Sequence, residues 1–203
     1  MKLFSYIVTH DTGFSPNPFW GVCTLADCKP AIRRTAEVGD WIVGLSPKAR
    51  GNCVVFAMEV DEVLDYASYF RDRRFANKIP DYTRGDVVWK AGDNIYKPLP
   101  KNGEFRQLRS VHSNGDEENP ETKAHDLGGL NVLTAKNFHY FGASGPELPP
   151  HLGELKVGRG HKNLFSQDTI LRFLKFISSY HKGVLAPPTN WPQGDSSWQQ
   201  VVK

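Results

Sequence analysis

The side chains with the most varied chemistry gather in one short segment near the start of the chain. Residues 10–20 combine an imidazole, a carboxylate, an amide and large aromatic rings within eleven positions. Proteins hold nucleic-acid bases by stacking them on aromatic faces and by hydrogen-bonding their edges with polar groups. Pro16 and Pro18 stiffen the segment, which lowers the entropy lost when it orders around a ligand. We therefore expect a pocket for a base or nucleotide. Its candidate residues include two tryptophans from strand ends and are His10, Asp11, Phe14, Asn17, Phe19, Trp20, Trp41 and Trp89.

Two of these residues have alternative interpretations. A tryptophan at a strand end often packs into the core, but the loop around Trp20 contains little other apolar material, so we expect Trp20 to be the stacking surface. We expect Asp11 to bond the edge of the base or to cap the loop. Asp11-Thr12-Gly13 also matches the catalytic turn of retropepsins, but those enzymes place apolar residues where this chain has His10.

The charged residues are unevenly distributed along the chain. The formal net charge is only +3, but residues 71–109 and 156–182 are basic and residues 110–155 are acidic. Two separated basic blocks suit a local anion site, for which a nucleic-acid backbone is the commonest partner. Ordinary scatter of charges on a solvated surface is the alternative interpretation. The candidate phosphate-binding residues are Arg71, Arg73, Arg74, Lys78, Arg159, His161 and Lys162.

Four common motifs of enzyme active sites are absent from the sequence. It contains no Gly-x-Ser-x-Gly elbow, no zinc-protease motif, no deaminase motif and no phosphate-binding loop of the nucleotide triphosphatases. Cys23 and Cys28 are interpreted as core or helix-edge thiols, and the pairs His112-Ser113 and His125-Asp126 as chance pairings in a polar loop. Three cysteines without a CxxC pair argue against a disulfide scaffold or a zinc site. We therefore assign no catalytic residue, cofactor or metal, and favour a binding protein over an enzyme.

The predicted elements alternate between strands and short helices. Apolar and β-branched runs predict strands at residues 3–9, 40–45 and 53–60, the last two forming a hairpin. A short helix capped by Asp27 is expected through residue 38, a helical turn over 66–76, and a hairpin from 86–89 and 94–96. Residues 105–111 are expected as a strand and 113–129 as a surface loop. The clearest helix spans 167–182, with Ser166 as its N-cap.

These elements indicate one domain of the mixed α/β (α+β) class. The chain has 203 residues, of which 12% are aromatic, so it can bury a sizeable core. No apolar run approaches the ~18 residues of a membrane span, and the polar first residues do not resemble an export signal, so a cytoplasmic protein is expected. We expect residues 1–183 to form the domain and residues 184–203 a Pro-rich extended tail.

Several of these segments resemble known families. Gly39-Asp40-Trp41-Ile42, followed by the strand at 52–60, resembles the PUA-like superfamily, which includes ASCH, YTH and EVE domains. More narrowly, Lys2–Thr12, Gly39–Gly44, Asn131–Gly142 and Arg159–Lys162 resemble the second type of nucleotide modification associated domain of bacteria and phages.

The resemblance implies a fold, a function and a partner. The fold is a curved antiparallel β-barrel or sheet with short helices and a C-terminal helix. The function is binding of modified bases or nucleotides, as a reader of, or accessory to, DNA base modification. The partner is nucleic acid, DNA more than RNA, or a modified nucleotide, with no role for a membrane.

Two other functions remain open. One is an enzyme of the glycosylase or transferase type that acts on modified nucleotides or DNA, with His10, Asp11 or Glu59 as acid or base. The other is a protein–protein adaptor that uses the Pro-rich tail.

Overall fold

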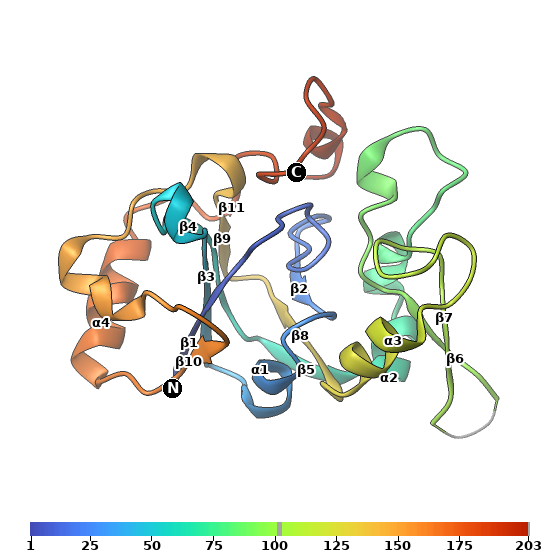
Figure 1. Ribbon diagram of the computed structural model, residues 1–203, viewed down its shortest axis with the longest axis horizontal. Coiled ribbons are helices and arrows are strands. Elements are labelled where there is room, and N and C mark those ends of the chain that lie inside the picture. Colours follow the sequence, from blue (N-terminus) through green and yellow to red (C-terminus); the bar gives the residue numbers. More distant parts are fainter. Residues whose placement is uncertain (101–102, 203) are drawn as a thin grey trace.

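A six-stranded sheet forms the centre of the fold in the computed structural model, which describes residues 1–100 and 103–202 (Figure 1). The strand order is β10-β1-β3-β4-β9-β11. The pairs β1–β3 and β9–β11 are parallel, and the other neighbours are antiparallel. The strands are β1 (Leu3–Ile7), β3 (Trp41–Leu45), β4 (Val54–Glu59), β9 (Phe138–Tyr140), β10 (His161–Lys162) and β11 (Gly183–Val184). The mixed α/β class and the mostly antiparallel sheet are confirmed.

The β3–β4 hairpin lies at the centre of this sheet, as the sequence predicts. Trp41 is opposite Glu59, and Gly44 is opposite Phe56. A side chain at position 44 would collide with the ring of Phe56, so this position requires glycine. Both strands are apolar on both faces and must therefore be covered on both sides.

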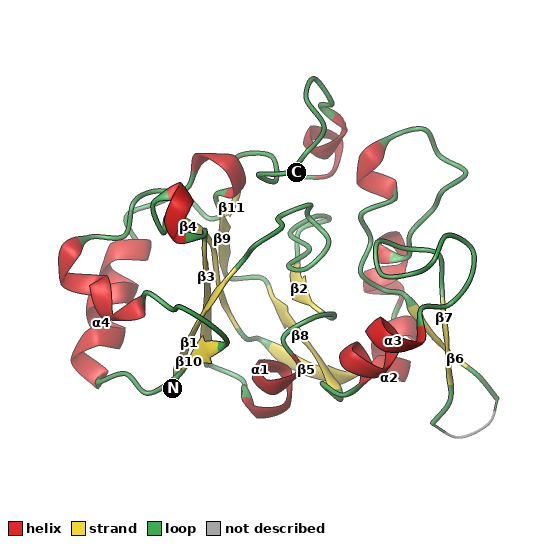
Figure 2. Ribbon diagram, in the orientation of Figure 1, coloured by secondary structure: helices red, strands yellow, loops and turns green. Residues whose placement is uncertain are grey.

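A second layer covers one face of the central sheet. It consists of a three-stranded sheet, β2-β8-β5, and short helices that pack beside it (Figure 2). The strands are β2 (Cys23–Leu25), β5 (Glu62–Asp65) and β8 (Asn131–Ala135). The helices are α1 (Pro30–Thr35), α2 (Tyr66–Arg71) and α3 (Pro120–Leu127). Between the two sheets lies an apolar core that includes Tyr6, Ile42, Met58 and Leu133.

The other face of the central sheet is covered by α4 (Gln167–Ile177). Phe173 and Ile177 are buried there against Trp41 and Val43. Ser166 accepts a hydrogen bond from the backbone of Thr169 at 3.1 Å, so the predicted N-cap is confirmed.

The helix α4 ends five residues before the predicted end at 182. Beyond Ile177, the hydroxyls of Ser178 and Ser179 donate to the carbonyls of Lys175 and Phe176. These local bonds compete with continuation of the helix.

The hairpin predicted from residues 86–89 and 94–96 is wrong. Val87–Trp89 is a short 3-10 helix, and β6 (Tyr96–Pro98) pairs instead with β7 (Phe105–Gln107). The expected turn residue Asp93 is buried, and its carboxylate accepts from the hydroxyls of Thr24 and Tyr69 at 2.5 and 2.7 Å. A residue held this way in the interior does not form an exposed turn.

The surface loop predicted for residues 113–129 is wrong for residues 120–127, which form the helix α3. Asn119 caps the helix α3 by accepting from the backbone of Glu121 and Thr122, and Pro120 occupies the first helical position. The helix carries Asp126 into the interior, where it is fully buried.

The C-terminal segment packs onto the first loop and onto the central sheet. β11 pairs with β9, and the backbone of Trp20 donates to the carbonyl of Val201 at 3.0 Å. Phe19 lies in one apolar cluster with Trp191 and Trp198. Residues 184–201 therefore share contacts with residues 10–20.

None of the sheets formed by residues 1–100 and 103–202 closes into a barrel. Among the same residues, no helix combines the length and the apolar character that a membrane crossing requires.

Candidate active site

The structure buries most residues of the predicted first-loop pocket. Four of them are no more than 3% exposed: Asp11, Phe14, Asn17 and Phe19. His10, by contrast, is exposed. The carboxylate of Asp11 accepts hydrogen bonds from the hydroxyl of Tyr140 and from the backbone and side chain of Thr189. These residues connect the loop to the sheet and to the C-terminal segment, and their role in binding a base stays a prediction.

The three predicted tryptophans lie in two places. Trp20 and Trp89 are in contact, with ring centroids 5.5 Å apart, beside Trp191 from the C-terminal segment. The indole nitrogen of Trp20 is buried, and none of residues 1–100 and 103–202 accepts a hydrogen bond from it. Trp41 lies apart from them, against Phe173 of α4.

Three of the predicted phosphate-binding residues bond within the protein: Lys78, Arg74 and Lys162, whose ammonium donates to the carbonyl of Glu154 at 3.2 Å. Lys78 is 1% exposed, and its ammonium donates to the carbonyl and side-chain oxygens of Asn17 at 3.0 and 2.6 Å. Burial lowers the pKa of Lys78 to about 8. Lys78 is therefore held inside the protein by Asn17, and its contact with a phosphate stays a prediction. Arg74 is exposed but forms ion pairs with Glu62 and Asp72.

The other predicted basic residues, and Lys162, lie at the surface in two separate places. The exposed ones are Arg71, Arg73, Arg159 and Lys162, and His161 is half-buried in β10. In Figure 1, α2 lies toward the right end of the long axis, whereas β10 lies left of the centre. The structure thus does not bring the two basic blocks together.

Three residues from distant segments meet between the second layer and the β6–β7 hairpin. The sulfur of Cys28 lies 3.6 Å from Nε2 of His112. The other ring nitrogen of His112, Nδ1, lies 2.6 Å from Oδ2 of Asp126. A thiol, an imidazole and a carboxylate joined in this order match a nucleophile, its base and the group that orients the base.

Asp126 fixes both of its partners. Its Oδ1 accepts a hydrogen bond from the backbone nitrogen of Cys28 at 2.8 Å. Its Oδ2 accepts from the hydroxyl of Tyr96 at 2.9 Å in addition to its contact with His112. Because Asp126 is fully buried on α3, the helix determines the positions of the thiol and of the imidazole together.

Arg33 holds the same segment from the opposite side. It is fully buried on α1, and its guanidinium donates to the carbonyls of Cys28, Asp126 and Asn131 at 2.7, 2.5 and 2.7 Å. Cys28 and Lys29 both have left-handed backbone conformations, with φ of 57° and 41°. Each such residue costs about 1–3 kcal/mol and persists only where the surroundings fix it. The bonds on both sides of Cys28 supply that constraint.

His112 reaches this position from a turn after β7. Its carbonyl accepts from the hydroxyl of Thr122 at 2.6 Å, which anchors the turn to α3. Its ring packs against Phe14, with centroids 4.7 Å apart. The side chain of His112 remains 18% exposed, so the imidazole end of the cluster is open to solvent.

The electrostatic surroundings favour a charged imidazole. Burial by itself lowers the pKa of His112, but the hydrogen bonds to Asp126 and Cys28 and the negative charge of Asp126 outweigh it and raise the pKa to about 10. Burial likewise raises the pKa of Asp126, and its bond to His112 more than compensates, so that this pKa lies below its usual value. His112 and Asp126 therefore form an ion pair at neutral pH. The imidazolium can therefore donate a hydrogen bond through Nε2 toward the sulfur of Cys28.

The same three residues also have the chemistry of metal ligands. One potential ligand atom from each lies within 4.8 Å of the others. However, the imidazole ring stands between its partners and uses a different nitrogen for each. A metal bound by Cys28 and His112 would leave Asp126 as an outer partner of the histidine. Two direct protein ligands are fewer than zinc sites use, so the arrangement fits proton transfer better.

Two polar groups beside this cluster have no hydrogen-bond partner among the described residues. They are the carboxylate of Asp27 and the hydroxyl of Tyr6, both buried. Burial, together with the negative charge of Asp126, raises the pKa of Asp27 well above its usual range. The predicted N-cap role of Asp27 is wrong, because Lys29 occupies that position of α1.

The sequence interpretation missed this cluster because its members are far apart. Cys28 is 84 residues from His112 and 98 from Asp126. A cysteine with histidine and aspartate elsewhere in the chain is a candidate nucleophile in general. The Asn119-Pro120 pair is a helix-start signal that would have placed Asp126 on a helix.

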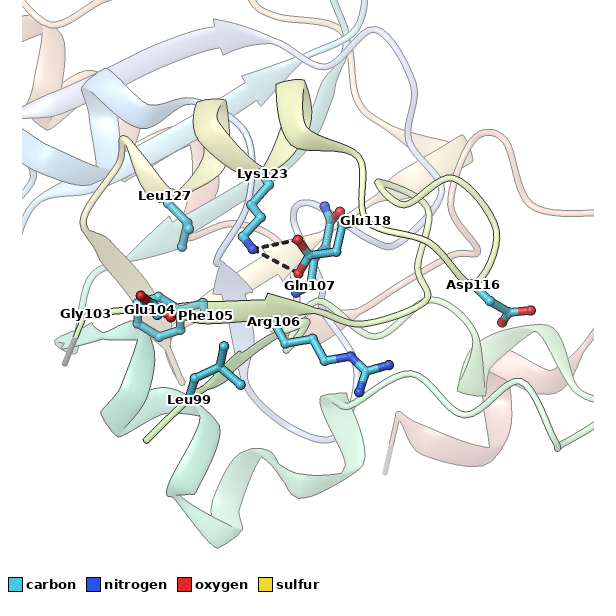
Figure 3. Close-up of a pocket in the computed structure, with 10 residues that line it drawn as sticks. All are labelled: Leu99, Gly103, Glu104, Phe105, Arg106, Gln107, Asp116, Glu118, Lys123 and Leu127. Carbon is cyan, nitrogen blue, oxygen red and sulfur yellow. Dashed lines mark hydrogen bonds and ion pairs between the residues drawn. The ribbon is translucent and has the colours of Figure 1, made fainter. Parts of the chain in front are cut away.

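A cavity of about 530 Å³ lies nearby, over the β6–β7 hairpin and α3 (Figure 3). Lys123 and Glu118 form an ion pair across it, with Nζ and Oε2 2.8 Å apart. The pair neutralises two of the charged residues that line the cavity, and none of Cys28, His112 and Asp126 lines it. We therefore place the candidate site at Cys28 and not in this cavity.

Comparison with known proteins points to one family. The family model of nucleotide modification associated domain 2 matches residues 1–195, a range that contains Cys28, His112 and Asp126. Searches of curated proteins and of solved structures gave no match. The narrower resemblance is thereby confirmed, whereas membership of the PUA-like superfamily stays a prediction. The chain belongs to the nucleotide modification associated domain 2 family, and its role is related to nucleotide modification.

Proposed function

We propose that the protein is a transferase-type enzyme of nucleotide modification that uses Cys28 as a nucleophile. The single observation that carries the proposal is the hydrogen-bonded series from Cys28 through His112 to Asp126. Cys28 and His112 are the catalytic residues, and Asp126 is a positioning residue because it acts through them. The substrate is a nucleotide or a base within DNA, as the family suggests.

The geometry supports a reaction in two steps. The thiolate of Cys28 forms a sulfur–carbon bond to an electrophilic carbon of the substrate, while the bond to the leaving group breaks and His112 gives that group its proton. A second nucleophile, such as water, a hydroxyl or an amine, then transfers its proton to His112 and bonds to the same carbon. The sulfur–carbon bond breaks, which restores the thiolate and the protonated imidazole.

Lys29 is suited to bind a phosphate of the substrate. It follows Cys28 directly, and its ammonium lies over the ring of Tyr6, 4.8 Å from the centroid. Burial lowers the pKa of Lys29, so an incoming anion would stabilise its charged form. The exposed Arg71, Arg73, Arg159 and Lys162 are the remaining candidates for contact with a nucleic-acid backbone, with DNA favoured over RNA.

The reactivity of the thiol can be tested without knowing the substrate. We expect iodoacetamide to alkylate Cys28 at pH 7 at least about tenfold faster than Cys53, and the His112→Gln variant to lose this difference. Cys53 is the matched control because it is half-buried like Cys28 and lies outside the cluster. Peptide mass spectrometry gives both rates in one sample. Equal rates in the unaltered protein would contradict the proposal.

The reaction can be tested with DNA that contains 5-hydroxymethylcytosine and with free deoxynucleotides. Nucleoside mass spectrometry should show an altered nucleoside, and intact-protein mass spectrometry an adduct, both absent in Cys28→Ser and present in Cys53→Ser. DNA that is bound but unchanged would instead favour the second candidate, a reader of base modification in a bacterial or phage system. A change that persists in Cys28→Ser would exclude the cysteine mechanism.

A further inference from the structure

A second cavity lies on the opposite face of the central sheet from Cys28. It has a volume of about 330 Å³ and lies between the sheet and the C-terminal end of α4. Its lining includes Trp41, Glu59, Asn137, His139, Tyr180 and Lys182. Trp41 packs with α4, whereas Tyr6, next to the Cys28 cluster, belongs to the core between the two sheets. The cavity is therefore independent of the proposed catalytic site.

The polar wall of this cavity offers hydrogen-bond acceptors. The amide nitrogen of Asn137 donates to Oε2 of Glu59 at 2.6 Å. Because a carboxylate accepts and does not donate, this bond fixes the orientation of the amide and leaves its oxygen facing away from Glu59. That oxygen is buried, and it has no hydrogen-bond partner in the part of the chain that the structure describes. A ligand that donates an N–H would satisfy it.

His139 adds a further acceptor to this wall. Its Nδ1 lies 2.9 Å from the carbonyl of His181, which requires a proton on Nδ1. Burial lowers the pKa of His139, and nearby Lys182 lowers it too, so the ring is neutral. In the neutral ring, Nε2 is left as an acceptor.

The aromatic walls and the rim suit a flat ring with a phosphate. Trp41 is held edge-to-face by Phe173, and Tyr180 by Phe141 and Phe176, so both rings are fixed before a ligand binds. Lys182 is exposed at the rim, where it can meet a negative group. The volume lies at the lower end of the range for small-molecule sites, about 300–1,000 Å³.

We propose that this cavity binds a nucleobase that carries an exocyclic amino group, presented as a nucleotide. Acceptors on Glu59, Asn137 and His139 pair with the amino group and repel a base that has a carbonyl oxygen in its place. Adenine and cytosine present such an amino donor, whereas thymine presents a carbonyl at the equivalent position. The bound nucleotide is a substrate group or an effector that is held without participation of Cys28.

Matched nucleotide pairs test the proposal in titration calorimetry with the full chain. Deoxycytidine monophosphate should bind at least about tenfold more tightly than deoxyuridine monophosphate, and deoxyadenosine monophosphate more tightly than deoxyinosine monophosphate. Within each pair the ligands differ by an amino group replaced with oxygen. Equal affinity within the pairs, or no binding of any of the four nucleotides, would overturn the proposal. Competition by n-butylammonium would assign the cavity to simple amines and would overturn it as well.

Protein variants locate the binding. Asn137→Ala should weaken binding of deoxycytidine monophosphate about tenfold, whereas Asn163→Ala, which alters the lining of a different cavity, should leave it unchanged. Cys28→Ser should also leave it unchanged, so loss of the cysteine reaction and loss of this site are distinguishable. Binding that disappears in Cys28→Ser would place the ligand at the other site and overturn the inference. If Asn137→Ala does not fold, the matched nucleotide pairs still decide.

Discussion

At the scale of single residues, Asp126 is the side chain on which the candidate site depends most. One carboxylate accepts from the backbone of Cys28, from the ring of His112 and from the hydroxyl of Tyr96. Removing it would free the thiol and the imidazole together and would leave the hydroxyl of Tyr96 without its acceptor. A buried charge of this kind is stabilising only while its partners remain in place.

The ion pair between His112 and Asp126 predicts how stability depends on pH. The pKa of His112 is raised from 6.5 to about 10 in the folded protein. Above pH 6.5 the folded state therefore binds more protons than the unfolded state, and the free energy of unfolding falls as the pH rises toward 10. Between pH 6.5 and 8 we expect a decrease of about 1–2 kcal/mol from this group, measured by urea denaturation.

The His112→Gln variant should lose this part of the decrease. His125→Gln is the matched control, because His125 lies on α3 beside Asp126 but its side chain is exposed. Lys78, whose pKa is lowered to about 8, makes the free energy of unfolding rise with pH near the upper end of this range. Because Lys78 is present in all three proteins, its contribution cancels in the comparison. The ion pair would be refuted by identical pH profiles for the unaltered protein and His112→Gln.

At the scale of elements, the site depends on how closely α1 and the end of α3 approach each other. Gly129 follows α3, and a Cβ at this position would overlap the buried guanidinium of Arg33. We predict that Gly129→Ala displaces Arg33 from the carbonyls of Cys28 and Asp126 and lowers the free energy of unfolding by about 1–3 kcal/mol. Guanidinium denaturation measures the loss, and alkylation of Cys28 by iodoacetamide should slow.

Gly153→Ala serves as the control for this prediction. A Cβ at position 153 meets no atom within 4 Å, so the substitution should change stability little. The contact between α1 and α3 would prove unimportant if the two alanine variants were equally stable.

The elements that could be predicted from the sequence are those whose signal is local. The runs that form β3 and β4 are apolar throughout, and Ser166 marks the start of α4, so each was found near its observed bounds. The end of α4 was missed because hydroxyls of Ser178 and Ser179 act there, and these have no strong sequence signature.

The candidate site could be predicted only in fragments. The polar composition of residues 113–129 predicts a loop, but residues 120–127 form α3, whose Asp126 is held by partners on three other segments of the chain. The sequence predicts an exposed first loop because residues 10–20 contain little apolar material besides their aromatic side chains. Their neighbours, such as Trp191, come from the other end of the chain. Contacts of this range cannot be predicted from periodicity or composition.

At the scale of the whole molecule, the central sheet separates two sites with different chemistry. The face toward the second layer carries the Cys28 cluster, and the face toward α4 carries the cavity lined by Trp41. The C-terminal segment connects the parts, because it extends the central sheet at β11 and then contacts the first loop. These contacts therefore hold the first loop in place. The loop contains Phe14, whose ring packs on the ring of His112.

Shortening the C-terminal segment should destabilise the protein. Chains that end at residue 183 or at residue 195 are compared with the full chain. Ending at 195 removes Trp198 and Val201 from the cluster around Trp20, and ending at 183 also removes Thr189, which bonds to the buried Asp11. We expect graded losses in the free energy of unfolding, reaching about 3–5 kcal/mol for the shorter chain, from lost aromatic packing and an unpartnered carboxylate. Urea denaturation of the three proteins measures the series. Equal midpoints would show that residues 184–203 are a separate tail, as the sequence predicts.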